Sequence, residues 1–183
     1  FSVQVDKGIA KQLKASQKQV LTLRVWNNKN LVGITTTSDL SENGLKKALY
    51  QANLASDYGN KNELTDFSPL AKDPIKDTNE VKKSPAGIKK LLETLRSAEN
   101  KLLKKHKAIK TIPYNGLSES FFKRLYANSD GAQRSYEKSQ AAIYLYARAE
   151  ENNRKPRSSG SVKIGYGLED IDINSCIDEA AEK

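Results

Sequence analysis

The sequence predicts an α+β fold with a mainly antiparallel β-sheet and two long helices packed on one face of that sheet. Apolar residues alternate with polar ones in segments near both ends of the chain, which is typical of half-buried strands. Two segments between them carry apolar residues at helical spacing. Because strands come in runs and do not alternate singly with helices, the order favours an antiparallel meander over βαβ units.

The first 38 residues predict three or four antiparallel strands. Val3 and Val5 share one side of the first strand, and Leu21, Leu23 and Val25 share one side of another. The turn cluster "NNKN" separates that strand from "LVGITTT", whose β-branched residues fit a further strand. The spacing of "GIAKQLKASQ" fits a strand or a helix, and we favour a strand.

A first helix follows over residues 41–56, with Ser41 as the N-cap that accepts from the free N–H groups of the first turn. We expect one buried stripe at helical spacing. Its members are Leu45, Ala48, Leu49, Ala52 and Ala55. Residues 57–83 then carry Gly, Asn, Asp, Pro and Lys without a sustained period, which predicts a long and mobile loop.

The second helix begins, in this prediction, with Ser84 as cap and Pro85 at the first helical position, where its missing N–H costs nothing. Its apolar stripe runs over about five turns. The stripe consists of Ile88, Leu91, Leu92, Leu95, Ala98, Leu102 and Leu103. Burial of so much apolar surface requires a large partner, and the sheet is the obvious one.

The remainder of the chain returns to β-type sequence and closes with an amphipathic helix. The predicted strands are 110–116, 118–128, 132–150 and 161–167, and the stretch 152–160 is an exposed loop. Ile173, Ile177 and Ala180 share one side of the last helix. We expect a single domain over residues 1–183, as a fragment of a longer protein, because the chain contains no methionine and its last helix lacks a capping glycine.

The segment "NSDG", which comprises Asn128, Ser129, Asp130 and Gly131, lies between two predicted strands. Asn, Asp and Gly tolerate the positive φ that tight hairpin turns require. A catalytic role for Ser129 and Asp130 would need a base within hydrogen-bond reach, and no histidine lies nearby in the sequence. We therefore predict a structural hairpin turn.

The sequence predicts no catalytic residue, no cofactor-binding residue and no metal site in this chain. A catalytic zinc ion usually takes three protein ligands, whereas the chain offers one histidine, His106, and one cysteine, Cys176. His106 lies among lysines, which favours a surface histidine near a helix end. Cys176 lies on the apolar side of the last helix, which favours a buried, inert thiol.

The net charge of +9 raises the question of a polyanionic partner. Most of the basic residues are lysines on helix faces, which indicates a solvated surface, although "KLLKKHKAIK" could meet phosphates. Aromatic residues make up 7% of the chain, and they form no obvious stacking platform of the kind that single-strand binders use. Nucleic-acid binding is therefore the weaker expectation. A lone cysteine and the lack of a secretory signal favour the cytoplasm.

Several segments resemble the TldD/PmbA family, also called the modulator of DNA gyrase family. The family has a "G-x-R-V … G-x-A-S-T-x-D-L-S" pattern before a helix, and the stretch from Leu21 to Ser56 is similar to it, with Arg24 and Val25 at the Arg-Val positions. Leu23 stands where the family often has Gly or Ala. The segments "YANSDGAQRSY", "YARAEENN" and "DINSCIDEAAEK" resemble the family's hairpin and the end of its N-terminal domain.

This resemblance implies a fragment of a dimeric, zinc-dependent peptidase that acts on small or unfolded peptides. The TldD type carries an H-E-x-x-x-H zinc motif, which this sequence does not contain, and the PmbA type pairs with a metal-bearing subunit. The sequences "TTTSDLS" and "AEENN" resemble the PmbA type more than the TldD type. Any zinc would then belong to a missing C-terminal domain or to the partner subunit.

Together the residues and the resemblance predict a non-catalytic N-terminal domain of a TldD/PmbA-like zinc metallopeptidase subunit. We expect it to help enclose an extended peptide or unfolded-protein substrate and to assemble the dimer, with an exposed sheet edge as a possible place for an added peptide strand. The alternative is a basic module associated with nucleic acid or linked to DNA gyrase.

Overall fold

The structure, a computed structural model, describes residues 1–60, 67–72 and 83–182 of the chain. The chain divides into two compact units. Unit 1 comprises Phe1–Ala15, Ile75–Ala127 and Gln133–Lys183, and unit 2 comprises Ser16–Pro74 and Asn128–Ala132. That residues 1–183 form a single domain stays a prediction.

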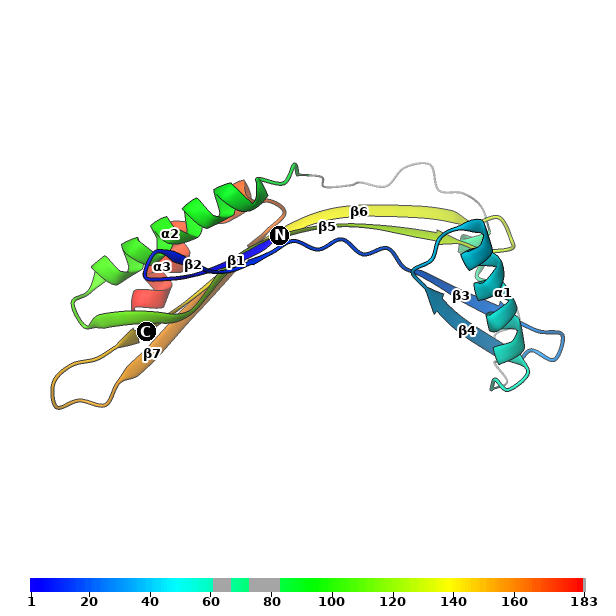
Figure 1. The fold of residues 1–183 in the computed structure, drawn as a ribbon, viewed down its shortest axis with the longest axis horizontal. Helices are drawn as coiled ribbons and strands as arrows, with labels where there is room; N and C mark the ends of the chain where they lie inside the picture. The colour runs from blue at the N-terminus through cyan, green and yellow to red at the C-terminus, as the bar shows by residue number, and fades with distance from the viewer. Residues whose placement is uncertain (61–66, 73–82, 183) are drawn as a thin grey trace. The chain divides into compact units, whose positions relative to one another are not determined.

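Unit 1 is built on a five-stranded sheet with the strand order β2-β1-β5-β6-β7, in which every neighbouring pair is antiparallel (Figure 1). Its strands are β1 (Ser2–Asp6), β2 (Ile9–Lys14), β5 (Ile109–Ala127), β6 (Gln133–Ala149) and β7 (Arg157–Gly165). The predicted α+β class with a mainly antiparallel sheet is therefore confirmed, and so is the strand interpretation of "GIAKQLKASQ".

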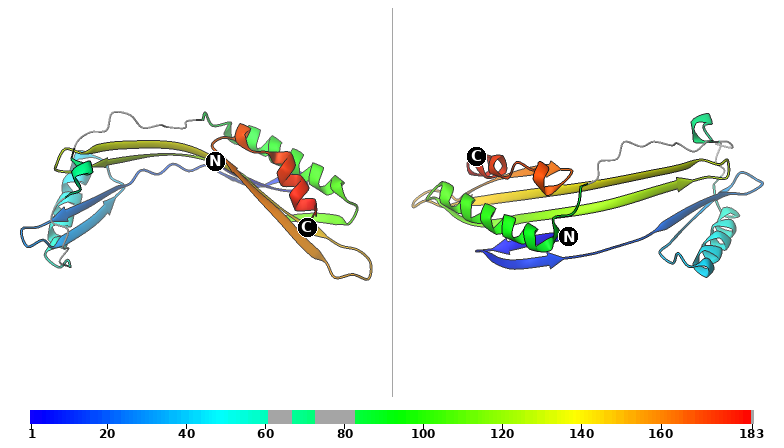
Figure 2. Two further views of the ribbon diagram at one scale, coloured as in Figure 1. Left: turned by 180° about the vertical axis from the view of Figure 1, so that it is seen from behind. Right: turned by 90° about the horizontal axis from the view of Figure 1, so that it is seen from above.

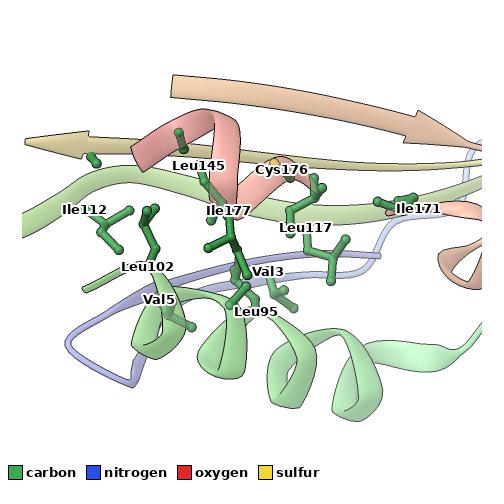
Figure 3. Packing of buried hydrophobic residues seen from close by; sticks show 14 of the residues in the cluster. Val3, Val5, Leu95, Leu102, Ile112, Leu117, Leu145, Ile171, Cys176 and Ile177 are labelled. Atoms are coloured by element: carbon green, nitrogen blue, oxygen red, sulfur yellow. The ribbon is translucent and has the colours of Figure 1, made fainter. Parts of the chain in front are cut away.

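Helices α2 (Gly87–Lys105) and α3 (Ile173–Glu182) cover one face of this sheet (Figures 1 and 2). Figure 3 shows the side chains that fill the space between the helices and the sheet. The core residues with no more than 1% of their surface exposed include Val3, Leu91, Leu95, Leu102, Leu117, Ile143, Leu145 and Ile177. The predicted α2 stripe faces this core, and β6 alternates as predicted, because period-two spacing directs every second side chain to the helices.

A carboxylate on α3 holds that helix against the edge strand β7. The Glu179 side chain accepts hydrogen bonds from Lys163 Nζ at 2.5 Å, from Ser161 Oγ at 2.7 Å and from Ser175 Oγ at 3.2 Å. These donors, with Lys163 as the largest cause, lower the pKa of Glu179 from 4.5 to about 2, because they stabilise the ionised carboxylate. The cluster joins residues of β7 to residues of α3 inside unit 1.

The start of α2 differs from the prediction. The helix begins at Gly87, and its N-cap residue is Ala86 and not Ser84. The side chain of Ala86 makes no capping hydrogen bond. The cap comes instead from Glu119 on β5, whose carboxylate oxygens accept from the Ala86 N–H at 2.9 and 3.2 Å and from the Gly87 N–H at 3.4 Å. The free N–H groups of a helix start favour such an anion.

Strand β5 is also longer than predicted. The sequence suggested two strands, 110–116 and 118–128, whereas the structure has one strand of 19 residues. Its register with β6 shifts between Ile109 and Tyr114, and these irregularities accommodate Pro113, which cannot donate to a regular ladder. Strand β7 begins at Arg157, so it takes up part of the predicted loop 152–160.

The side-chain amide of Asn115 on β5 makes the hydrogen bonds to β1 that a backbone peptide group would make in a regular ladder. Regular pairing of these strands covers Ser2 and Val3. At Val5, the Asn115 Oδ1 atom accepts from the backbone N–H at 3.0 Å, and Nδ2 donates to the Val5 carbonyl at 2.9 Å. One buried amide therefore satisfies both polar groups of Val5, as burial requires.

Unit 2 pairs the two-stranded sheet of β3 (Leu21–Trp26) and β4 (Val32–Thr37) with helix α1 (Glu42–Ser56). Ser41 caps α1 as predicted, since its Oγ atom accepts from the Gly44 N–H at 3.1 Å. The predicted apolar stripe is wrong in part: the buried residues are Gly44, Ala48, Ala52 and Ser56. Leu45 and Leu49 are 39% and 55% exposed.

The close approach of α1 to β4 explains this small-residue face. A Cβ atom at Gly33 of β4 would collide with the Ala52 carbonyl oxygen and with Ser56 N. Helix and strand therefore meet backbone to backbone, and alanines fit this contact where leucines would not.

Most of the loop predicted over residues 57–83 lies outside the described residues. The described part contains residues 57–60, the 3₁₀ turn Pro69–Ala71 and Lys83. Among the helices of the described chain, none is both long enough and apolar enough to cross a membrane.

Candidate functional site

The predicted turn residues 128–131 lie in the connection between β5 and β6, which comprises residues 128–132, and Asn128 makes hydrogen bonds within it. The Asn128 Oδ1 atom accepts from the backbone N–H groups of Asp130 at 3.1 Å and Ala132 at 2.9 Å. Its Nδ2 atom donates to the Ala71 carbonyl at 2.7 Å. Gly131 has a φ of +90°, a conformation that favours glycine. In this geometry Asn128 orders the turn, and Asp130 lies 4.0 Å from Lys72 Nζ.

His106 and Cys176 both lie in unit 1, and each has a hydrogen-bond partner of its own. The Nδ1 atom of His106, just after α2, accepts from the Ala108 N–H at 3.2 Å. The Cys176 thiol is buried and donates to the Ser161 carbonyl at 3.6 Å. Burial raises the pKa of Cys176, because a thiolate there would lose its hydration.

Across residues 1–60, 67–72 and 83–182, no three His, Cys, Asp or Glu side chains form a group that could hold a metal ion. The zinc ion that the family resemblance implies therefore has no matching donor set among these described residues.

The outer edges of β2 and β7, and the part of β5 beyond Glu119, have no neighbouring strand in the described sheet. Strand β1 pairs with β5 as far as Glu119, whose backbone N–H and C=O bond to Phe1 at 2.9 and 2.8 Å. In an antiparallel ladder, every second residue directs its polar backbone groups to the same side. Phe121, Lys123 and Leu125 continue the row of Glu119 and point away from β6.

The part of the β5–β6 hairpin that extends beyond β1 and β7 is called the arm here, and it comprises residues 120–127 and 133–140. Strand β7 pairs with β6 only from Ala141 onward, so the arm is two-stranded in the sheet described. Figure 2 shows β5 and β6 running side by side along the arm. Such a ribbon has marginal stability alone and accepts a third strand readily.

Both faces of the β5 half of the arm carry apolar side chains around a cation. On the face with odd residue numbers, Phe121 and Leu125 are 52% and 74% exposed, with Lys123 between them. On the other face, Phe122 and Tyr126 flank Arg124. An added strand would therefore meet apolar and cationic side chains on each of its two faces.

The two cations differ in their electrostatic surroundings. Lys123 Nζ lies 2.6 Å from Glu137 Oε1 on the neighbouring strand. Arg124 is exposed and has no ion pair with any residue of the described chain. Its cross-strand partner is Tyr136, which contacts Phe122 with 6.1 Å between ring centroids.

The sequence predicted the hairpin but not its free edge. Strand pairing joins residues that lie far apart in the chain, so a local pattern cannot show which edge stays uncovered. One local signal exists: apolar and charged residues occupy both alternate positions of "SFFKRLY", which is unlike a strand with one buried face.

A family model described as "PmbA/TldA metallopeptidase central domain" matches residues 82–183, which include α2, β5, β6, β7 and α3. The match covers more than half of the chain.

The chain belongs to the TldD/PmbA family.

The predicted family is thereby confirmed. The matching model is described as a central domain, whereas the N-terminal domain of the family was expected from the sequence.

Three solved structures have a similar fold over nearly the whole chain. TldE from Thermococcus kodakarensis is 17% identical with a TM-score of 0.82, and 100% of this chain matches 41% of that one. A candidate modulator of a DNA gyrase from Thermotoga maritima is 17% identical with a TM-score of 0.77, and the match covers 100% and 40% of the two chains. A candidate modulator of DNA gyrase from Bacteroides thetaiotaomicron is 12% identical with a TM-score of 0.82, and the match covers 99% and 42%.

The chain thus spans about two fifths of the length of these TldD/PmbA-like structures. At such low identity the likeness shows the fold. No curated protein sequence matches the chain.

Proposed function

We propose that this chain is a non-catalytic domain of a TldD/PmbA-type metallopeptidase subunit and that it helps to enclose an extended peptide substrate. The observation that carries the proposal is the match of residues 82–183 to a family model described as a metallopeptidase central domain. The peptide adds as a strand at the outer edge of β7, which has β6 on one side and no strand of the described sheet on the other.

Backbone chemistry supports this mode of binding. The N–H and C=O groups of Val162 and Ile164 point away from β6, because β6 bonds to the odd-numbered residues Ser161 and Lys163 of β7. They can exchange hydrogen bonds with any extended peptide, largely regardless of its side chains. The exposed Val162 and Ile164 side chains then lie against apolar residues of the added strand. A peptidase that acts on unfolded chains needs this tolerance of sequence.

The remaining parts of the proposal concern the assembly. The chain contributes to a homo- or heterodimer with another TldD/PmbA-type subunit, in the cytoplasm, and the zinc ion is held elsewhere in the assembly. Among the two family types we favour PmbA. The family description and the lack of a zinc donor set among the residues described support this arrangement.

A proline at position 162 tests the edge directly. The Val162 N–H points outward, so proline removes a donor that the β6–β7 ladder does not use, and prolines are tolerated at such edge positions. We expect the Val162→Pro variant to bind fluorescently labelled, unstructured peptides about ten-fold more weakly, because one peptide carbonyl loses its partner. Fluorescence anisotropy measures the change.

The Val162→Ala variant is the matched control, since it shortens the same side chain but keeps the backbone N–H. It should bind within about two-fold of the wild type, and circular dichroism should show that both variants fold. Equal affinities of the wild type and a folded Val162→Pro variant would refute the proposed edge.

A further inference from the structure

Strand β7 presents different side chains on the two faces of its edge. Ser161 and Lys163 lie on the face that α3 covers, where both donate to Glu179. Val162 and Ile164 lie on the face opposite α2 and α3, which is called the outer face here, and they are 50% and 63% exposed. A strand added at this edge would therefore meet polar groups on one face and apolar groups on the other.

Tyr146 of β6 extends the apolar surface of the outer face. It pairs with Gly160 of β7, and a Cβ atom at Gly160 would lie 2.3 Å from Tyr146 Cδ1. The ring therefore lies over Gly160, which has no side chain to separate the ring from the edge of the sheet. Because Tyr146 is 41% exposed, its ring can contact a side chain of an added strand.

The antiparallel ladder fixes the spacing of the peptide residues that meet this surface. Directly opposite residues of an antiparallel pair have their side chains on the same face. The peptide residue opposite Ile164 comes first along the peptide, the residue opposite Val162 follows two places later, and the residue opposite Gly160 follows after two more. The peptide residues between them lie on the α3 face, beside Ser161 and Lys163.

We propose that the β7 edge is selective for peptide segments in which apolar and polar residues alternate. Aliphatic residues lie opposite Ile164 and Val162, and an aromatic residue lies opposite Gly160, where it contacts the Tyr146 ring. The inference rests on the proposed strand addition and names the class of peptide that the edge prefers. Such alternation is typical of half-buried strands, so unfolded proteins that contain β-strands would expose suitable segments.

A second copy of this chain is the competing occupant of the edge. The register that pairs Ile164 with Val162 of a second copy would place the two Lys163 side chains directly opposite each other, and like charges in this position destabilise a strand pair. The formal charge of +9 on each chain adds to the repulsion. These charges favour a peptide without net positive charge over a second copy.

The test compares three fluorescently labelled peptides, each flanked by serines. Val-Thr-Val-Thr-Phe alternates, Val-Val-Thr-Thr-Phe has the same composition without alternation, and Lys-Thr-Val-Thr-Phe places a lysine opposite Ile164. We expect the wild type to bind the alternating peptide about two- to ten-fold more tightly than either of the others, because each lost cross-strand pair weakens binding. Fluorescence anisotropy measures the affinities.

The Ile164→Glu variant should reverse one of these preferences. Its carboxylate lies opposite the peptide lysine, so this variant should bind the Lys peptide more tightly than the alternating peptide. The matched control is Ile9→Glu, which makes the same change on the other edge strand, β2, at a residue that is 71% exposed. It should keep the preference of the wild type, and circular dichroism should show that both variants fold.

A double-mutant cycle tests the aromatic position. The peptide change of Phe to Ser and the protein change Tyr146→Leu should weaken binding by less together than the product of their separate effects, because the aromatic pair exists only when both rings are present. Independent effects of the two changes would overturn the aromatic preference.

The outcomes separate this inference from the proposed function. Equal binding of the three peptides by the wild type, with weaker binding by Val162→Pro, would overturn the preference for alternation and leave strand addition intact. Absence of binding by every peptide would overturn both. Equal reversal in Ile9→Glu and Ile164→Glu would show that the peptides respond to charge alone and would overturn the inference. A dimer of the wild type that Ile164→Glu abolishes and that excludes peptide would assign the edge to a second copy and would also overturn it.

Discussion

The cap that Glu119 gives to α2 leads to a prediction with a defined size. Glu119 is 8% exposed, and its carboxylate accepts from two consecutive N–H groups at the start of the helix. The Glu119→Ala change would leave both donors without this acceptor and would remove a negative charge from the positive end of the helix dipole.

Three measured effects give the magnitude. Loss of an N-cap costs about 1 kcal/mol, and loss of a favourable charge at a helix start costs about 0.3–1 kcal/mol. Poorly solvated donors add to this cost, since a buried group that loses its partner costs about 1–3 kcal/mol. We therefore expect Glu119→Ala to lower the free energy of unfolding by about 2 kcal/mol.

Urea unfolding followed by far-UV circular dichroism measures this change. The control is Glu119→Gln, whose amide oxygen still accepts from the helix but carries no charge, and it should cost about 1 kcal/mol. The slope of free energy against urea should stay constant, which would show that the variants differ in stability and not in the extent of unfolding. A loss below about 0.5 kcal/mol for Glu119→Ala would refute the capping role, because this is the scatter of ordinary surface substitutions.

Two further predictions concern the other contacts described above. Gly33→Ala should destabilise unit 2 by about 1–3 kcal/mol, because its methyl group would meet the Ala52 carbonyl, and the fluorescence of the sole tryptophan, Trp26, reports this unit; an unchanged midpoint would contradict the close approach. Glu179 has a pKa lowered to about 2 in the folded state, so its contribution to stability is present above the unfolded pKa and is lost as the pH falls toward 2. The difference in melting temperature between the wild type and Glu179→Gln should therefore shrink from pH 6 to pH 2, and a constant difference would contradict the assigned contacts.

The helix α2 shows what a local pattern can predict. Its apolar residues recur at helical spacing over the full length, and one broad face is buried against a large sheet, so periodicity alone identifies the core side. Its first residue could not be predicted, because the cap belongs to Glu119, more than thirty residues away, and the local Ser84-Pro85 signal is not used.

The helix α1 shows the opposite case. Its leucines are the more hydrophobic residues, yet its alanines are buried, because the partner strand carries Gly33 and leaves room for small side chains alone. The order of the strands in the sheet was hidden for a related reason. The pairing of β1 with β5 depends on Asn115 and on pairs more than a hundred residues apart in the sequence.

The amide hydrogens of β7 give the most direct test of the account. In the free chain the N–H groups of Val162 and Ile164 should exchange quickly with solvent, whereas those of Ser161 and Lys163 should be protected by β6. A saturating unstructured peptide should slow exchange at Val162 and Ile164 and leave Ser161 and Lys163 unchanged. Unchanged exchange at Val162 and Ile164 in a chain that has bound the peptide would show that the peptide binds elsewhere.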